Sequence, residues 1–219
     1  MLKKLFLLIL LLTPMNSFAD TINAKVLELQ NGWDHISFEI KNNRQQKKAI
    51  RDLSTLAINY SNQYPDSAEI KAWAGIIIST EAGFYRLNVV KALKTATLAK
   101  DILEEALLLD PNVINGGVYS SLGLLYNEVP GSPIGFGDKD LAKNFLTKAL
   151  KISPNGMISN FFNGQYYFQK KEYSAALQYF KKAKQGSFQD NRELAKKGTI
   201  KEIAQWINLE NQEKKKNFI

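Results

Sequence analysis

The sequence predicts an all-α fold, built as a solenoid of helical hairpins. Apolar residues recur at intervals of three and four, the spacing of one helix face. One such series is Leu98, Ile102, Leu103, Ala106 and Leu109. Strand-like alternation of apolar and polar residues never persists for more than a few positions. Three helical segments end in similar tripeptides with a central proline, at 64–66, 110–112 and 153–155, because proline cannot continue the helical backbone ladder.

Residues 1–19 have the pattern of a cleavable export signal. Lys3 and Lys4 give a basic start, residues 5–12 are an unbroken apolar run, and Ser17 and Ala19 supply small residues before the cut. The run is shorter than the roughly 20 residues that a membrane-spanning helix needs. The sequence therefore predicts a periplasmic or equivalent extracytoplasmic protein without stable membrane insertion. It also predicts one domain over 20–212 and a basic tail over 213–219.

The composition limits the classes of partner and of stabilising bond. The chain has no cysteine, so the exported protein must be stabilised by packing rather than by disulfides. Its net charge of +8 is modest and scattered, apart from the three lysines at 214–216. Such a pattern is a poor fit for nucleic acid, which we exclude as a partner.

Helices are expected at both ends of the domain. Residues 24–40, which include Trp33, should pack on a helix over 49–60 as a degenerate first pair. At the other end one apolar face is formed by Leu194, Ile200, Ile203, Ala204 and Ile207. A terminal helix of this kind covers the open core of the last repeat. Together with the central pairs, this gives about nine helices.

A repeated pattern of alanines marks the second helix of three pairs. It reads Ala99-x3-Leu103-x2-Ala106-x4-Pro111, then Ala142-x3-Leu146-x2-Ala149-x4-Pro154, then Ala176-x3-Phe180-x2-Ala183, with Phe188 at the place of the proline. A first helix precedes each. These read Tyr119-x2-Leu122-Gly123-x2-Tyr126, Asn163-Gly164-x2-Tyr167 and, more loosely, Trp73-x2-Ile76-Ile77-x2-Thr80. Small alanines allow the two helices of a pair to approach closely.

This order of residues resembles the tetratricopeptide repeat. The signature of that family is a bulky residue, Leu-Gly and Tyr, followed by Ala, an aromatic or Leu, Ala and Pro, over about 34 residues. The spacing from Ala142 to Ala176 is 34 positions. The resemblance implies three recognisable repeats, a degenerate N-terminal pair and a C-terminal capping helix, arranged as a non-enzymatic scaffold that binds a protein or peptide.

Two stretches lengthen the repeats, and we expect both to be enlarged turns between helices. From Ala99 to Ala142 is 43 positions, and the surplus lies mainly in the proline- and glycine-rich stretch 127–138. From Thr80 to Ala99 is 19 positions, with the extra residues near 81–86. Such turns often build a binding face. The inserted-turn residues with side chains suited to a ligand are Phe84, Tyr85, Arg86 and Phe136.

The stretch 127–138 is not a phosphate-binding loop. A P-loop requires Gly-Lys-Ser/Thr, whereas Lys139 follows Asp138 and precedes Asp140. A dinucleotide fingerprint requires a third glycine at the position of Asp140. We expect Asp138 to be the N-cap of the next helix, where its carboxylate would bind free backbone N–H groups.

The chain also resembles, more weakly, exported small tetratricopeptide-like proteins that include the T component of TRAP transporters. The resemblance covers roughly residues 45–185. It rests on the export signal, the long Pro-Gly-x-Pro…Gly-Asp turn before an Ala/Leu/Ala helix, and the overall size. It implies an accessory protein that binds a small apolar or amphipathic solute and contacts a periplasmic solute-binding protein. That component is typically a lipoprotein, and this chain lacks the necessary cysteine.

The inventory of chemically active residues is small. His35 is the single histidine, and cysteine is absent, so a metal cluster or a Cys/His nucleophile pair cannot be built. We therefore expect no enzyme activity, no metal site and no cofactor. A Ser/Lys dyad or a carboxylate pair assembled from residues far apart in the sequence is the alternative that stays open. His35 is interpreted as structural.

In the tetratricopeptide family the first helix of each pair lines a concave groove, so the repeat alignment predicts the residues that face it. They are Lys71, Ile78 and Glu81, then Ser120, Leu124, Asn127 and Glu128, then Phe161, Gln165, Phe168 and Gln169. Clamping of a peptide carboxylate by Lys, Arg and Asn is disfavoured, because only Lys71 and Asn127 are available. Packing between helices is the alternative role for the phenylalanines. A closed apolar cavity would favour a solute, and an open groove would favour a peptide.

Overall fold

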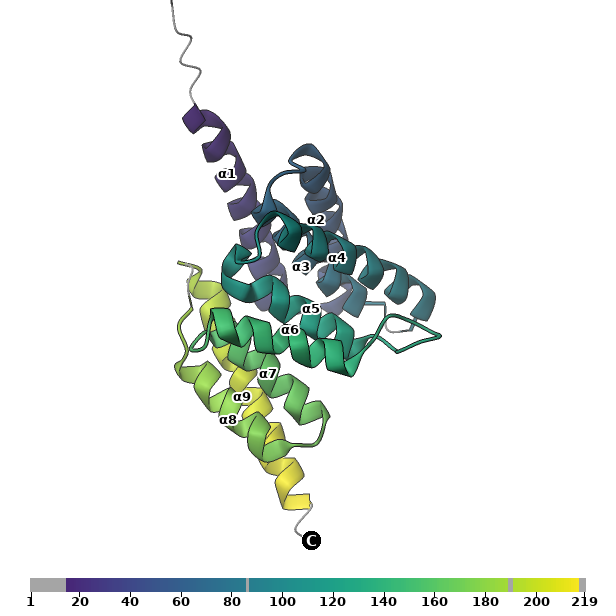
Figure 1. The fold of residues 1–219 in the computed structure, drawn as a ribbon, viewed down its shortest axis with the longest axis vertical. Helices are drawn as coiled ribbons and strands as arrows, with labels where there is room; N and C mark the ends of the chain where they lie inside the picture. Colours follow the sequence, from purple (N-terminus) through teal and green to yellow (C-terminus); the bar gives the residue numbers. More distant parts are fainter. Residues whose placement is uncertain (1–14, 86, 189–190, 217–219) are drawn as a thin grey trace, which may run out of the picture.

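Nine α-helices and two short helical turns form the chain over residues 15–85, 87–188 and 191–216, which a computed structural model describes (Figure 1). The helices are α1 Met15–Asp34, α2 Asn43–Gln63, α3 Ala68–Gly83, α4 Val89–Leu109, α5 Gly117–Glu128, α6 Lys139–Ile152, α7 Met157–Gln169, α8 Tyr173–Gln185 and α9 Glu193–Lys216. A π-helical turn, η1, spans His35–Glu39, and a 3-10 turn, η2, spans Val113–Gly116. No strand occurs in these ranges, and the predicted all-α fold is confirmed.

The helices begin and end where short polar side chains and prolines dictate. Asp138 accepts hydrogen bonds from the backbone N–H groups of Asp140 and Leu141, at 2.8 and 2.9 Å. The predicted N-cap is confirmed. Asn42, Ser67 and Asn88 cap α2, α3 and α4 in the same way. Helices α2, α4 and α6 end directly before the three predicted proline tripeptides.

Three successive hairpins, α3–α4, α5–α6 and α7–α8, form the array (Figure 1). In each hairpin a glycine of the first helix faces the large residue between the two alanines of the second. A Cβ built on Gly75, Gly123 or Gly164 would lie 2.4, 2.7 or 2.5 Å from the side chain of Leu103, Leu146 or Phe180, respectively. These distances are too short for any side chain. Each glycine is therefore the point of closest approach within its hairpin.

The glycines also correct the alignment of the first hairpin. The loose pattern placed Ile77 at the position of Gly123 and Gly164, but Gly75 is the residue that contacts the second helix. The predicted alignment of α3 is therefore wrong by two positions. The error arose because Trp73-x2-Ile76-Ile77 imitates the expected order of large residues, whereas the close helix approach requires glycine.

The two predicted turn enlargements have different outcomes. Residues 129–138 do form an extended turn between α5 and α6, which folds back on itself by hydrogen bonds from Gly137 N–H to Pro130 O and from Asp138 N–H to Tyr126 O. The prediction for residues 81–86 is wrong, because α3 continues to Gly83 and α4 begins at Val89. Most of the surplus there lengthens the helices, and α4 has 21 residues where α8 has 13.

The predicted domain limits fall within helices. Helix α1 begins at Met15, so it passes through the predicted cleavage position after Ala19. Helix α9 continues to Lys216, past the predicted start of the tail at residue 213. The basic and apolar parts of the predicted export signal, residues 3–12, lie outside the described residues. Ile22 is the first of the described apolar side chains that pack against the core.

The two ends of the array meet. Arg192, directly before α9, forms an ion pair with Asp34 at the end of α1, although 158 positions separate them. Both side chains are buried, being 10% and 5% exposed. Farther along α9, Gly198 lies against Phe38 of η1. Figure 1 shows the start of α9 beside α1. The two ends of the array are thus in contact and partly close its inner side.

Candidate functional site

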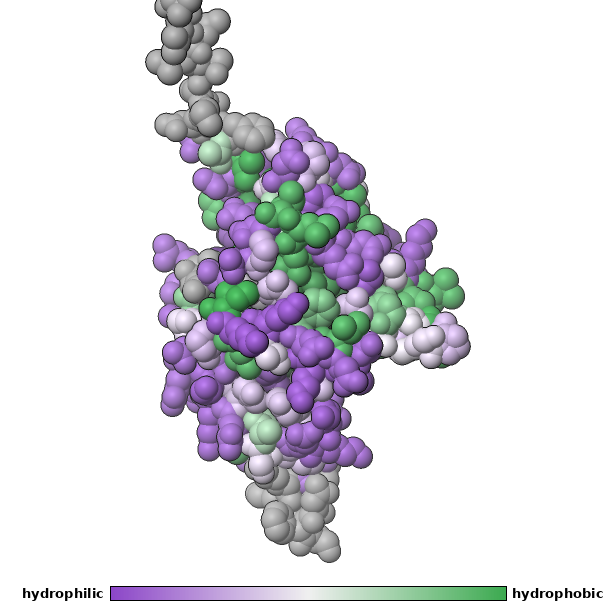
Figure 2. Space-filling view, in the orientation of Figure 1, coloured by the Kyte–Doolittle hydropathy of each residue, from purple (hydrophilic) through white to green (hydrophobic). Residues whose placement is uncertain are grey.

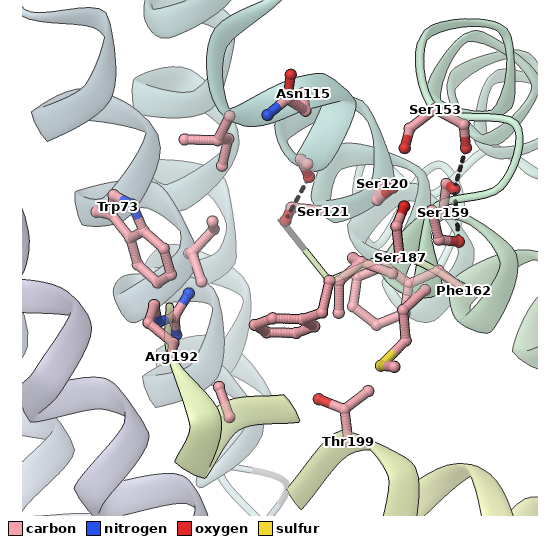
Figure 3. A pocket seen from close by; sticks show the side chains of 18 of the residues that line it. Trp73, Asn115, Ser120, Ser121, Ser153, Ser159, Phe162, Ser187, Arg192 and Thr199 are labelled. Carbon is pink, nitrogen blue, oxygen red and sulfur yellow. Dashed lines mark hydrogen bonds between the residues drawn. The ribbon is translucent and has the colours of Figure 1, made fainter. Parts of the chain in front are cut away.

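A pocket of about 170 Å³ lies where the first helices of the three hairpins come together (Figure 3). Helices α3, α5 and α7 supply about half of its wall. The rest comes from Trp33, η2, the residues just before α7, Ser187, Phe188, Arg192 and the start of α9. The wall includes Trp73, Ser120, Ser121, Phe162, Arg192 and Thr199. The pocket therefore occupies the inner side of the array, which the chain ends partly close.

Equivalent positions of the repeats supply three of the wall residues. Trp73, Ser121 and Phe162 each stand two positions before the hairpin glycine of their helix, and all three line the pocket. Since the same offset along a helix gives the same direction around its axis, the repeat geometry points these three side chains at one space. Trp73 and Phe162 therefore line the pocket with aromatic rings, and Ser121 lines it with a small hydroxyl.

Two buried polar groups of the pocket wall have no hydrogen-bond partner within the described part of the chain. They are the indole Nε1–H of Trp73 and the hydroxyl of Ser120. Trp73 is 5% exposed and Ser120 is fully buried. A buried polar group without a partner costs free energy, roughly 1–3 kcal/mol, and such groups are uncommon in native structures. Neither atom has exposed surface, so a bound group reaches them only if the side chains that cover them move.

Arg192 forms the wall of the pocket at the junction of the chain ends. Its Nε donates to Asp34 Oδ2 at 2.9 Å, and its Nη2 donates to Asp34 Oδ1. The guanidinium lies 4.4 Å from the ring centroid of Trp73 and 5.8 Å from that of Trp33. The guanidinium thus lies close to two aromatic rings while it binds the carboxylate through two nitrogens, an arrangement that lysine could not reproduce.

The structure brings three of the predicted groove residues together, away from this pocket. At the C-terminal ends of α5 and α7, Asn127 Nδ2 donates to Gln169 Oε1 at 2.6 Å, and Gln169 Nε2 donates to Glu128. The Lys139 ammonium donates to Asn127 Oδ1 at 2.9 Å. These side chains join adjacent hairpins to one another.

The three predicted residues of the α3 segment lie in the packing between helices, as the wrong alignment explains. Lys71 is buried and donates to Glu105 of α4 at 2.6 Å. Ile78 is fully buried in the core. Glu81, also buried, accepts a hydrogen bond from the hydroxyl of Tyr85.

The other predicted groove residues differ in their surroundings. Ser120 lines the pocket, whereas Leu124 and Gln165 are half-buried outside its wall. Phe161 is buried with its ring 6.1 Å from that of Phe180. Phe168 lies edge-on to Trp206 of α9, with centroids 5.0 Å apart. Both phenylalanines therefore pack between helices, which is the alternative role predicted for them.

The residues of the predicted inserted turns are partly structural. Tyr85 is buried, and burial, with a smaller contribution from the hydrogen bond to Glu81, raises its pKa to about 12. Phe136 is half-buried and contacts Tyr126 edge-on, at 5.3 Å between centroids. Phe84 is half-buried at the end of α3. Arg86 lies outside the described residues.

Sequence reasoning missed most of the pocket. Trp73, Ser121 and Phe162 could have been found from the glycines, because all three share one offset from them. Arg192 and Thr199 carry no such signal, since they come from outside the repeats. Within the described ranges, no three histidine, aspartate or glutamate side chains are grouped as metal ligands. No helix among the described residues is long and apolar enough to cross a bilayer.

Three stacked helical hairpins with a pocket along their first helices define a helical-repeat scaffold, a class of protein that binds other proteins. The tetratricopeptide assignment agrees with a comparison with known families. Residues 134–155 match the model of the tetratricopeptide repeat, a segment that runs from the end of the inserted turn through α6.

Other comparisons add little. No curated protein sequence matches the chain. A solved structure from work entitled "Functional Characterization of Pseudomonas Aeruginosa pilF" is similar over 90% of this chain and 99% of that chain, at 20% identity. The TM-score is 0.35, and a value this low supports no conclusion about function.

Proposed function

We propose that the protein is an exported, non-enzymatic scaffold that holds an extended segment of a partner protein at the pocket on the inner side of its helical array. One apolar side chain of the segment would fill the pocket, and a backbone carbonyl beside it would accept a hydrogen bond from Trp73. The observation that carries the proposal is a pocket built from equivalent positions of three first helices that contains two buried, unpaired polar groups.

The size of the pocket favours a side chain over a solute. Pockets for small molecules usually measure about 300–1,000 Å³, whereas this pocket measures about 170 Å³. A space of that size accepts one large apolar side chain. The alternative, a transport accessory that binds a small apolar or amphipathic solute, requires a larger enclosed volume.

The polar groups favour a peptide backbone as the neighbour of that side chain. The indole Nε1–H is only a donor, and a serine hydroxyl both donates and accepts. A peptide unit offers one acceptor and one donor, so it can satisfy Trp73 and Ser120 together. A purely apolar solute would leave both unpaired.

Site-specific crosslinking tests the proposal. A photoreactive phenylalanine analogue at Ser121, in the pocket wall, should give discrete protein adducts in exporting cells, and mass spectrometry would identify the partner peptide. The matched control is Thr147 on α6. Its hydroxyl donates to the carbonyl four residues earlier, at 2.8 Å, as that of Ser121 does at 3.0 Å, but Thr147 is exposed and does not line the pocket. Identical adducts at both positions would count against the proposal.

Trp73→Phe tests the indole hydrogen bond. The substitution keeps an aromatic ring but removes an N–H that is unpaired in the free protein. We expect affinity for the crosslinked peptide to fall about five- to tenfold, and the thermal midpoint to fall, because the smaller ring packs less well against Arg192. Titration calorimetry with the synthetic peptide measures the first, and thermal denaturation the second. Unchanged affinity would show that the indole N–H does not contact the partner.

Export is the second part of the proposal. It is supported by the basic start, the apolar run 5–12 and the small residues before Asp20. N-terminal sequencing of protein recovered from the periplasmic fraction should begin at Asp20. Recovery of the intact chain from the cytoplasm alone would contradict it.

A further inference from the structure

An exposed apolar patch lies at the edge of the array where two inter-helix turns come together. We call it the turn patch, and it consists of Leu87, Val89, Val90 and Ile134. These side chains are 104%, 57%, 80% and 61% exposed, respectively, so each projects into solvent rather than into the core. None of them lines the pocket on the inner side of the array.

The 129–138 turn lies against the start of α4 at this edge. A Cβ on Gly135 would lie 3.0 Å from Leu93 Cδ1, and Val89 and Val90 lie one helical turn before Leu93, on the same side of α4. Figure 1 shows the 129–138 turn projecting from the body beside the start of α4, and Figure 2 shows hydrophobic surface at that projection. Ile134 and the two valines therefore form one raised surface.

The charges on the α3–α4 side of the turn patch have one sign, whereas Glu128 and Asp138 flank the uncharged residues of the other turn. Between residues 82 and 98 every charged residue is basic, and residues 129–137 contain no charge at all. Lys91 and Lys94 are exposed on the first turns of α4, and the Lys91 ammonium lies 4.1 Å from the ring centroid of Tyr85. Raised aliphatic side chains with a basic rim match a surface that is apolar inside and negatively charged outside.

We propose that the turn patch docks the protein on the surface of an anionic lipid bilayer. The aliphatic side chains enter the boundary between headgroups and acyl chains, and Lys91 and Lys94 contact the lipid phosphates. Interfacial membrane proteins bind lipid through the same two contributions to the binding free energy. They bury apolar area, and their basic residues are attracted to anionic lipid. The protein then lies on the membrane with its peptide pocket still open, and none of the helices in the described ranges crosses the bilayer.

A second copy of the chain fits the patch less well. A two-fold contact through the turn patch would bring the lysines of one copy toward those of the other, and like charges at an interface are unfavourable. An anionic bilayer pairs these lysines instead.

Vesicle binding tests the proposal. The protein used begins at Asp20, because the apolar run 5–12 would itself bind lipid, and Ile22 is the first of the described apolar side chains that pack on the core. It should sediment with vesicles of phosphatidylglycerol and phosphatidylcholine, and much less with phosphatidylcholine alone. Leu87→Ser/Val90→Ser/Ile134→Ser should lower the partition coefficient about tenfold or more. Lys91→Gln/Lys94→Gln should lower it about fivefold per lysine, and should remove most of its salt dependence.

Leu108→Ser is the matched control for the apolar substitutions. Leu108 is 86% exposed but lies near the other end of α4, about 27 Å along the helix from Val90. This variant should bind vesicles like the wild type. Circular dichroism would verify that every variant is folded.

The absence of cysteine allows a direct measure of insertion. An environment-sensitive fluorophore on Val90→Cys should shift to the blue with anionic vesicles, and one on Leu108→Cys should not. Equal binding by the triple variant and the wild type, or no binding by the wild type, would overturn the proposal. A concentration-dependent dimer that the triple variant abolishes would assign the patch to a second copy instead.

Discussion

At the scale of single residues, Tyr85 shows how a side chain expected at a binding turn is used in the core. It is 5% exposed, its hydroxyl donates to the Glu81 carboxylate, and the ammonium groups of Lys91 and Lys47 lie 4.1 and 5.2 Å from its ring centroid. These contacts join the end of α3 to α2 and α4. Tyr85 therefore fixes the turn that carries part of the turn patch.

The raised pKa of Tyr85 makes stability sensitive to alkaline pH. Burial, followed by the hydrogen bond to Glu81, raises the pKa from 10.0 to about 12. As pH rises, the unfolded chain releases this proton first. The contribution of Tyr85 is therefore fully present below pH 10 and is lost between about pH 10 and 12, by about 1.4 kcal/mol per pH unit. Urea unfolding across the alkaline range would measure this slope.

Tyr85→Phe should reduce the alkaline slope, because the ionising group is gone. It should also lower stability near neutral pH by about 1–3 kcal/mol, since buried Glu81 loses its donor. Tyr119→Phe, at a half-buried position on α5, is the control and should keep the slope. An unchanged slope in the Tyr85 variant would show that other groups cause it.

At the scale of elements, the hairpins are defined by a glycine opposite a large residue flanked by alanines. The alanine pairs of α4, α6 and α8 are all fully buried. Gly75, Gly123 and Gly164 allow the first helices to touch these surfaces. The size of the residue between the alanines thus sets the separation of each hairpin's helices.

Gly164→Ala should destabilise the third hairpin. Its Cβ would lie 2.5 Å from Cδ1 and Cε1 of Phe180, and Phe180 cannot retreat, because Trp206 lies behind it with ring centroids 5.9 Å apart. Overpacking costs about 1–3 kcal/mol, against a gain in helix propensity of up to about 1 kcal/mol. We expect a net loss of about 1–2 kcal/mol in chemical denaturation.

Gly83→Ala is the control for this helix substitution. Gly83 ends α3, and nothing lies within 4 Å of a Cβ built on it. This variant should be as stable as the wild type or slightly more stable. A Gly164 variant with equal stability would show that the third hairpin is packed more loosely than described.

At the scale of the whole molecule, the array is partly closed by contact between its ends. The Arg192–Asp34 pair is the link, and Trp33 and Trp73 cover the guanidinium. Arg192, Trp33 and Trp73 also form part of the pocket wall, so closure and pocket shape depend on a shared set of contacts.

Arg192→Gln should open this closure. It leaves the buried Asp34 carboxylate without its bidentate partner, and breaking a buried ion pair in this way costs about 3–5 kcal/mol. In hydrogen–deuterium exchange, amides at the start of α9 and in η1 should exchange faster, while those of α5 and α6 should not change. Lys48→Gln, which removes an exposed pair with Asp52, should leave the exchange of α9 unaltered. Protection of α9 that persists in the Arg192 variant would mean that other contacts hold the ends together.

The sequence by itself determined the helices, their proline ends, the alanine pattern of the second helices and the extended turn at 129–138, because these depend on local spacing and on the backbone chemistry of a few residues. The sequence alone misaligned the first hairpin. Its pattern of large residues also fits with Ile77 at the glycine position, and only the contact distance to α4 shows that Gly75 holds that position. Only the tertiary structure decided that the ends meet and that Trp73, Ser121 and Phe162 share one pocket with Arg192. Those relations join residues far apart in the chain, and they follow from how the hairpins stack rather than from any local pattern.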